Sequence, residues 1–443
     1  MFTRREFLQT ASISTASVLS TNMAMGADNP SDRITVGIIG LGSRAFNLIN
    51  SLLAESDAQI VALCDVDEFH HRDLPWGQGS AFGRKPAQKK VSERYAKKKK
   101  SGTVSHIDLY SDFREVCQRD DIDAVIVATP DHWHAAITLY ALKNGKDVYC
   151  EKPVTHRFRE GQLVYREVEK QNAIFQTGSQ QRSGKEFHQA VELVRNGHLG
   201  TIKGIEVGLP PGYSAPMGDT TAIKPPETLD YDFWCGPSEK LPYMRARHHR
   251  WWRGHSAYGG GVLMDWIGHH NDIAQWAIGF ERSGPISVEA VGWTFPQDTT
   301  YDTPHQYEIK CQYPGNVSIT ISSKYKNGVR IVGTSGSLYV NRGKIEASDP
   351  RILKPGFKRG SKTVYASPGH MRNFLDGIKS RKECIAPAEI AHRSITPGHL
   401  GYVSHALGRK LAWDAKQEIV VDDAEANKLL NQLQYRAPWM IDS

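Results

Sequence analysis

A glycine-rich turn between an apolar strand and a helix does most to constrain the fold of this chain. Six residues starting at Gly40 read Gly-Leu-Gly-Ser-Arg-Ala, after the apolar run 34–40 and before the helical pattern of 43–54. A continuous apolar run is typical of a parallel strand buried on both faces. Gly40 permits a tight turn, Gly42 lets the backbone approach a diphosphate at the helix N-terminus, and the small Ala45 lets helix and strand pack closely. The turn therefore predicts a dinucleotide-binding loop.

An acidic residue stands where such a loop needs one. The second apolar strand, 59–65, ends at Asp65, 25 residues after Gly40. A carboxylate at this place is suited to bond the adenosine ribose hydroxyls, and the next residue is Val66 rather than an arginine, which favours NAD over NADP. Ser43 and Arg44, which follow the second glycine, are further predicted cofactor contacts. A tight turn that binds no ligand is the alternative.

Strands and helices continue to alternate in the first third of the chain. Residues 123–129 and 147–150 are apolar strands with a helix at 134–144 between them, and the polar segment 67–105 is predicted to be an insertion that leads into a helix. This alternation predicts a doubly wound parallel sheet, a Rossmann domain over residues 33–155.

The pattern changes after residue 156. Strands follow one another without intervening helices, which predicts an open, mainly antiparallel sheet in an α+β domain over 156–443. The expected strands are 201–209, 286–295, 306–313, 316–325 and 329–340, and the expected helices are 157–171, 185–196, 368–380 and 389–410. The last helices are expected to return toward the first domain. The long aromatic segment 210–255 is predicted to cover a site.

Two loops carry candidate chemistry on the first sheet. Thr129, Pro130 and His134 follow one parallel strand, and Glu151 and Lys152 follow the next. Since the carboxyl ends of parallel strands meet at one edge, both loops are expected to reach the nicotinamide end of the cofactor. A lysine beside a cationic ring has its charged form disfavoured, so Lys152 can shuttle protons near neutral pH. A solvated surface lysine is the alternative.

A third element lies in the second domain. Asp265 and His269 stand at i and i+4 of a predicted helix and share one face, with Asp272 one turn further along the same side. Histidine is the usual acceptor of a hydroxyl proton, and a nearby carboxylate can orient it. A structural histidine capped by a local aspartate is the alternative. The neighbouring His269 and His270 have no further ligand at metal-site spacing, so no metal is predicted.

Taken in order over residues 33–410, these motifs resemble the Gfo/Idh/MocA oxidoreductase family. The resemblance implies a Rossmann domain joined to an α/β domain with an open antiparallel sheet, and a homo-oligomer, dimer or tetramer, formed through that sheet. It implies Lys152 as the active-site lysine, Asp265 and His269 as paired catalytic residues, and His134 and Glu151 at the nicotinamide pocket.

Three further residues are candidates for the substrate side. The segment 176–182 resembles one found in exported members of the family, which implies that Gln180 and Arg182 face the substrate. Trp252, with other tryptophans of 210–255, could stack on a sugar ring or simply pin the loop.

The N-terminus predicts export. Paired arginines, Arg4 and Arg5, precede a weakly apolar stretch that ends in small residues, which resembles a twin-arginine signal over 1–27 and predicts a periplasmic protein. The stretch is too short and polar for a permanent membrane anchor. A net charge of +7 without a basic, aromatic face excludes nucleic-acid binding, and six scattered cysteines predict no disulfide framework.

These features together predict an NAD-dependent oxidoreductase that oxidises a hydroxyl of a sugar or glycoside. Outside the cytoplasm no soluble nicotinamide pool is expected, so the cofactor should be tightly held and recycled on the enzyme. A redox-neutral glycosidase that works by oxidation, elimination and reduction is one alternative. A non-catalytic NAD-binding protein is the other.

Overall fold

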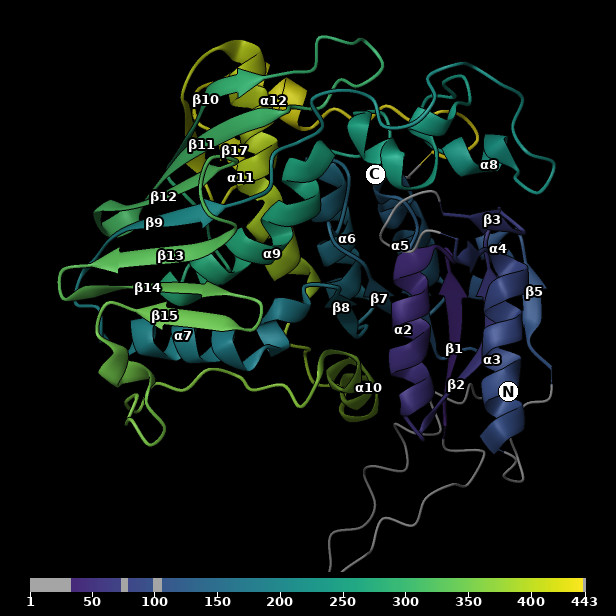
Figure 1. The fold of residues 1–443 in the computed structure, drawn as a ribbon, viewed down its shortest axis with the longest axis horizontal. Coiled ribbons are helices and arrows are strands. Elements are labelled where there is room, and N and C mark those ends of the chain that lie inside the picture. Colours follow the sequence, from purple (N-terminus) through teal and green to yellow (C-terminus); the bar gives the residue numbers. More distant parts are fainter. Residues whose placement is uncertain (1–32, 73–78, 99–105, 441–443) are drawn as a thin grey trace, which may run out of the picture.

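A computed structural model describes residues 33–72, 79–98 and 106–440, which form two sheets side by side with their helices (Figure 1). The predicted export signal, 1–27, lies outside the described residues. The predicted fold class, a Rossmann domain beside an α+β domain with a mainly antiparallel sheet, is confirmed. None of the described helices is long and apolar enough to cross a membrane.

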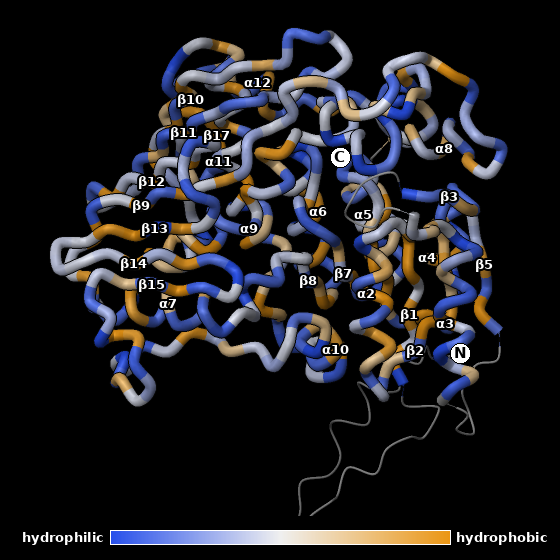
Figure 2. Tube along the Cα trace, in the orientation of Figure 1, coloured by the Kyte–Doolittle hydropathy of each residue, from blue (hydrophilic) through white to orange (hydrophobic). Residues whose placement is uncertain are grey.

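The first sheet is parallel and has the strand order of a dinucleotide-binding fold. Its order is β5-β2-β1-β6-β7-β8. The strands are β1 (Ile34–Ile39), β2 (Ala58–Cys64), β5 (Asp108–Tyr110), β6 (Ala124–Val127), β7 (Asp147–Cys150) and β8 (Phe175–Thr177). Apolar residues fill most of these strands (Figure 2), and all of them except the half-buried edge strand β5 are buried between two layers of helices. Because β8 belongs to this sheet, the sheet extends past the predicted domain boundary at 155. The order reverses between β1 and β6, where such sheets bind ligands.

Helices cover both faces of this sheet, and one of them comes from far along the chain. They are α2 (Ser43–Ala54), α3 (Arg84–Lys98), α4 (Phe113–Cys117), α5 (His134–Lys143), α6 (Phe158–Lys170) and α10 (His370–Ser380). A small hairpin of β3 (His70–His71) and β4 (Ala81–Phe82) precedes α3. Arg372 of α10 pairs with Asp57 at 2.7 Å, just before β2, and Arg381 pairs with Asp147 at 2.6 Å. The C-terminal region is thereby joined to the first domain by two ion pairs.

The second sheet is mixed, with one parallel contact between β9 and β12 and antiparallel contacts elsewhere. Its order is β15-β14-β13-β9-β12-β11-β10-β16-β17. The strands are β9 (Ile202–Gly208), β10 (Ser287–Thr294), β11 (Gln306–Tyr313), β12 (Val317–Ser322), β13 (Gly328–Gly333), β14 (Gly336–Asn341), β15 (Lys344–Ala347), β16 (Leu411–Asp414) and β17 (Ile419–Val420). The single strand predicted over 329–340 is wrong, because Thr334 and Ser335 form a tight turn between β13 and β14, and Gly336 takes a φ of 150° there.

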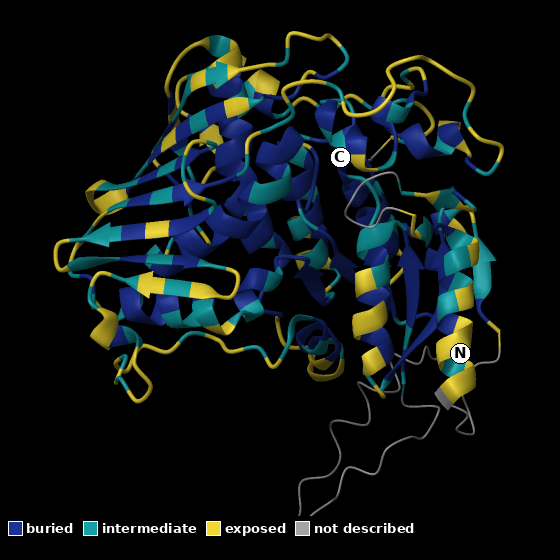
Figure 3. Cartoon of the chain, in the orientation of Figure 1, coloured by how far each residue is buried: buried dark blue, intermediate teal, exposed yellow. Residues whose placement is uncertain are grey.

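One face of this sheet packs on helices, and exposed residues alternate with buried ones on its strands (Figure 3). The helices are α7 (Lys185–Arg195), α9 (Gly261–Ile278), α11 (Ala388–Leu407) and α12 (Ala424–Leu430). Helix α9 lies between the two sheets (Figure 1) and packs against α7 and α11. It is therefore placed to carry side chains toward the first domain.

Residues 210–255, here called the strap, cross from the second domain onto the first. The strap contains α8 (Tyr231–Cys235) and the short 3-10 helices η4 (Arg245–Arg247) and η5 (His249–Gly254). Its backbone pairs with the loop after β2, since Glu68 N donates to Thr228 O at 2.8 Å and Asp230 N donates to Val66 O at 3.1 Å. The strap therefore closes over the edge where β2 ends.

The position of Arg182 corrects a prediction from the sequence. Arg182 was expected to face the substrate, but its side chain is 2% exposed. Its Nε and Nη2 donate to the two carboxylate oxygens of Asp272, each at 2.7 Å, and its guanidinium lies 4.8 Å from the centre of the Trp276 ring. A buried guanidinium needs such a bidentate partner, and Asp272 on α9 supplies it. The pair thus joins η3 (Gln180–Ser183) to α9.

Removing one member of this pair should be costly. Arg182→Met leaves the Asp272 carboxylate buried without its counterion, and we expect the free energy of unfolding to fall by about 3–5 kcal/mol. The measurement is urea unfolding followed by tryptophan fluorescence. As a control, Arg330→Met removes the exposed pair with Glu206, which should change stability by less than about 1 kcal/mol. Equal effects of the two variants would contradict the structural role of Arg182.

Candidate active site

A single cavity of about 470 Å³ joins the glycine-rich turn to helix α9. Its wall is made by both domains and by the strap. The residues that line it include, from the first domain, Gly40, Gly42, Ser43, Arg44, Asp65, Thr129, Pro130, Glu151 and Lys152, and from the remainder Gln180, Trp252, Arg253, Asp265, His269 and Arg342. Most residues predicted from the two loops, the turn and the helix therefore meet in one space.

The turn end of the cavity fits a dinucleotide. Gly40 has a φ of 85°, and a Cβ there would lie 2.6 Å from the backbone nitrogen of Thr129, because β1 and β6 are neighbours. A Cβ on Gly42 would meet nothing within 4 Å, so this backbone is open to the cavity. No side chain of the described residues caps the start of α2 at Gly42. The N–H groups of its first turn are therefore free to bind phosphate oxygens.

Asp65 organises the same end. Its carboxylate accepts from Leu41 N at 2.5 Å and from Asp67 N at 2.8 Å, which ties the loop after β2 to the glycine-rich turn. Burial raises the pKa of Asp65, and the two backbone donors partly offset that effect. Each carboxylate oxygen retains a second lone pair for a ribose hydroxyl. The position thus fits the predicted ribose contact.

Arg44 links the turn to the loop after β7. Its Nε lies 2.7 Å from Glu151 Oε1, and its Nη2 donates to Gln180 Oε1 at 2.5 Å. All three side chains line the cavity. Gln180, predicted to face the substrate, therefore reaches the cavity while it is held by Arg44.

His134 differs from its prediction, because it does not line the cavity. The ring is buried, with Nδ1 2.6 Å from Pro153 O and Nε2 3.0 Å from Thr129 O. Burial lowers the pKa of His134, so the neutral ring donates one of these bonds. The start of α5 turns this side chain inward between the two motif loops. His134 thus positions the loops that carry Thr129 and Lys152 instead of contacting a ligand.

The opposite end of the cavity is built around Asp265. Lys152 Nζ donates to Asp265 Oδ1 at 2.6 Å and to the Asp265 carbonyl at 2.9 Å, and Arg253 Nε lies 3.0 Å from the same Oδ1. Burial alone would raise the pKa of Asp265, but Arg253 and Lys152 together hold it well below its usual range. Asp265 is therefore ionised, and it fixes the lysine ammonium at the cavity wall.

His269 lies one helical turn from Asp265 and is 5% exposed. Its Nδ1 is buried, and no residue in the described parts of the chain bonds it. Burial, followed by the charges of Lys152 and Arg342, lowers its pKa well below the usual value. The ring is thus neutral and can accept a proton. The sequence predicted that Asp265 would orient His269. In the structure the Asp265 carboxylate accepts a hydrogen bond from Lys152 instead.

Asp131 and Arg253 are among the cavity residues that the sequence reasoning missed. Asp131 is 2% exposed, and burial raises its pKa to about 8, partly offset by Arg253. Asp131 lies within the motif 129–134, and this position was the one feature of the sequence that could have marked it as a site residue. Arg253 lies on the strap with its guanidinium 4.2 Å from the centre of the Trp252 ring. No pattern in the sequence links Arg253 to Asp265. Trp252, which was predicted as a stacking surface, lines the cavity, and the Arg253 guanidinium lies over one face of its ring.

Curated relatives match part of the chain. A glycosyl hydrolase family 109 protein from Solibacter usitatus is 33% identical over 146 residues, 32% of this chain and 29% of the relative. An alpha-N-acetylgalactosaminidase from Shewanella oneidensis is 23% identical over 218 residues, 45% of this chain and 44% of the relative. The matched regions thus span less than half the length of these relatives.

Solved structures share the fold over most of the chain. An aldose-aldose oxidoreductase from Caulobacter crescentus superposes with a TM-score of 0.60 at 19% identity, covering 86% of this chain and 99% of that one. The WlbA dehydrogenase from Bordetella pertussis, in complex with NADH and UDP-GlcNAcA, gives 0.58 at 17% identity, covering 85% and 98%.

Family descriptions match both domains. Residues 34–179 match the oxidoreductase family NAD-binding Rossmann fold, and residues 186–441 match the oxidoreductase family C-terminal alpha/beta domain. Both descriptions are of one family, and the order of its two domains is the order in this chain. The protein therefore belongs to the Gfo/Idh/MocA oxidoreductases and binds NAD.

Proposed function

We propose that this protein oxidises a hydroxyl of a sugar or glycoside with bound NAD. The observation that carries the proposal is the cluster of Lys152, Asp265 and neutral His269 in the cavity that begins at the glycine-rich turn. When bound, NAD supplies the acceptor for the hydride that leaves the substrate carbon, and in a redox-neutral cycle it returns that hydride.

The side chains divide the proton chemistry between them. Neutral His269 has a lone pair with which to take the hydroxyl proton. Lys152, whose ammonium is held by Asp265 at 2.6 Å, is placed to stabilise negative charge on the substrate oxygen. Asp131, with a pKa of about 8, carries a proton at neutral pH and can donate a hydrogen bond. A cationic, an acidic and a basic group thus line one cavity.

A carbohydrate suits the other lining residues. Trp252 offers an aromatic surface, and Gln180, Arg253 and Arg342 offer hydrogen-bonding groups around it. The solved neighbours include an aldose-aldose oxidoreductase and a dehydrogenase bound to a nucleotide sugar. These likenesses support a sugar-related substrate and leave the particular sugar open to experiment.

A redox-neutral glycosidase is the second candidate, because the curated relatives include an alpha-N-acetylgalactosaminidase. Such an enzyme shares the first oxidation, in which His269 would take the hydroxyl proton while the hydride on the same carbon goes to bound NAD. The resulting carbonyl acidifies the neighbouring C–H, loss of that proton expels the glycosidic oxygen, and water addition precedes the final reduction.

We also propose that the enzyme works in the periplasm with retained cofactor. The paired arginines near the N-terminus support export of a folded protein. The strap supports retention, since its backbone pairs with the loop after β2, beside Asp65. A cofactor enclosed in this way would serve repeated cycles without exchange.

Two alanine variants test the catalytic cluster. Lys152→Ala and His269→Ala should each lower turnover of an accepted sugar by about 10²–10⁴-fold, because the first removes the cation beside the substrate oxygen and the second removes the group that takes the hydroxyl proton. The NAD content, measured after denaturation, should stay at the wild-type level. Lys203→Ala and His106→Ala alter exposed residues of the same types and should leave turnover unchanged. Near-wild-type rates in either cluster variant would sink the proposal.

Isotope exchange separates the two candidate reactions. A glycosidase should cleave a chromogenic glycoside without net NADH, and in D₂O its product should carry deuterium on the carbon beside the oxidised position. A dehydrogenase should instead change the absorbance of the bound cofactor near 340 nm and leave that carbon unlabelled. If no sugar or glycoside produces either signal, the protein is a non-catalytic NAD-binding protein.

The protonated state of Asp131 makes a pH prediction. The native protein should keep this proton up to pH about 8, whereas the unfolded chain loses it near the ordinary value of 3.8. The native state then binds the extra proton between these values, so this group's contribution to stability falls as pH rises, by at most about 1.4 kcal/mol per pH unit. Asp131→Asn carries no such proton. Urea unfolding at pH 5, 6, 7 and 8 should show that the free energy of unfolding of the variant rises relative to that of the wild type as the pH increases. A difference between the two that does not change with pH would refute the protonated state of Asp131.

A further inference from the structure

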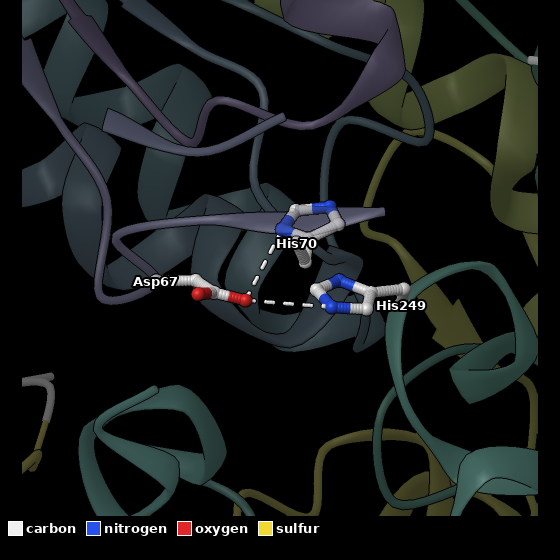
Figure 4. A group of neighbouring side chains, drawn as sticks. All are labelled: Asp67, His70 and His249. Carbon is white, nitrogen blue, oxygen red and sulfur yellow. Dashed lines mark ion pairs between the residues drawn. The ribbon is translucent and has the colours of Figure 1, made fainter. Parts of the chain in front are cut away.

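A carboxylate and two imidazoles meet where the strap crosses the first domain (Figure 4). Asp67 lies in the loop after β2, His70 begins β3, and His249 begins η5 of the strap. Asp67 Oδ2 lies 3.1 Å from His70 Nδ1 and 3.4 Å from His249 Nε2. Asp67 is 3% exposed, so its charge is held away from water. The catalytic proposal uses none of these three residues.

The distances between these three side chains match those between the ligands of one transition-metal ion. Four ligands at about 2.0–2.1 Å in a tetrahedron stand about 3.3–3.4 Å from one another. The two distances from Asp67 Oδ2, 3.1 and 3.4 Å, agree with that geometry. Two imidazoles with one carboxylate are a common donor set for zinc and its neighbours, with the fourth position left to water. All three residues line the cavity, which leaves room for that water.

The nitrogen of His70 that faces Asp67 is also free to coordinate an ion. His70 Nδ1 is buried and makes no well-aligned hydrogen bond within the described residues, although Asp67 Oδ2 is only 3.1 Å away. The rings of His70 and His249 are stacked, with centres 3.5 Å apart and planes at 19°. For both nitrogens to aim at one ion, the rings must turn from this stack about their side-chain torsions.

We propose that Asp67, His70 and His249 bind one divalent transition-metal ion, with zinc the best fit, and that this ion fastens the strap to the cofactor domain. The ion would bridge two segments about 180 residues apart in the sequence. It would add metal–ligand bonds to the main-chain pairing of Glu68 with Thr228 and of Asp230 with Val66. Since this contact closes the cavity beside Asp65, a bound ion would slow the exit of NAD.

Zinc binding to the untagged protein tests the site directly. After treatment with a chelator, the wild type should bind one Zn²⁺ in competition with a chromophoric chelator, and Co²⁺ should give the visible bands of a tetrahedral complex. His70→Gln and His249→Gln should each weaken binding on the order of 100-fold, because each removes a ligand. His71→Gln, at the exposed neighbouring histidine, is the matched control and should bind as the wild type does. Equal zinc binding by all four proteins, or none by the wild type, overturns the site.

Cofactor release tests the fastening separately. Bound NAD should leave the wild type more slowly with Zn²⁺ than after chelation, and this difference should vanish in His249→Gln. Zinc that binds without changing the release rate overturns the fastening role. Neither measurement uses a sugar, so failure of this inference is distinguishable from failure of the proposed catalysis.

Discussion

The rest of the site depends on the ion pairs that the half-buried carboxylate of Asp265 makes with two cations. One carboxylate oxygen accepts a hydrogen bond from the ammonium of Lys152 and lies 3.0 Å from Nε of Arg253. These three side chains come from the loop after β7, from helix α9 and from the strap. A buried carboxylate with a single partner tends to lose more in desolvation than it gains, and a second cation offsets that cost. Holding this charge in the half-buried wall of the cavity therefore requires the two domains and the strap to come together.

Helix α9 carries two aspartates that serve different purposes. Asp265 and His269 line the cavity, whereas Asp272 binds Arg182 in the protein interior. Their spacing puts all three on one side of the helix, but seven residues of rise are about 10 Å, enough to pass from the cavity wall into the core. One ion pair thus orders the active end of the helix, and the other anchors its middle against η3.

Local patterns were a good guide to the elements and to the residues beside the glycine-rich turn. Gly40, Asp65 and Lys152 could be placed because loops at the carboxyl ends of adjacent parallel strands must share one edge. The same reasoning failed for Arg182 and His134. Both belong to segments that adjoin the site, but their side chains turn into the protein. There Arg182 donates to the Asp272 carboxylate, and His134 contacts two backbone carbonyl groups. A position in a motif does not specify the direction of a side chain.

The sequence by itself determined the two-domain fold, the NAD-binding turn and the helix that presents Asp265 and His269, because strand and helix periods and the glycine spacing act over short distances. Only the tertiary structure decided that Asp265 bonds Lys152 and Arg253, that Asp131 keeps a proton, and that His249 lies against Asp67 and His70. The Lys152–Asp265 pair and the contacts of His249 with Asp67 join segments more than 100 residues apart, and the proton on Asp131 depends on burial. No local pattern of residues encodes the desolvation of a carboxylate or the partner that arrives from a distant strap.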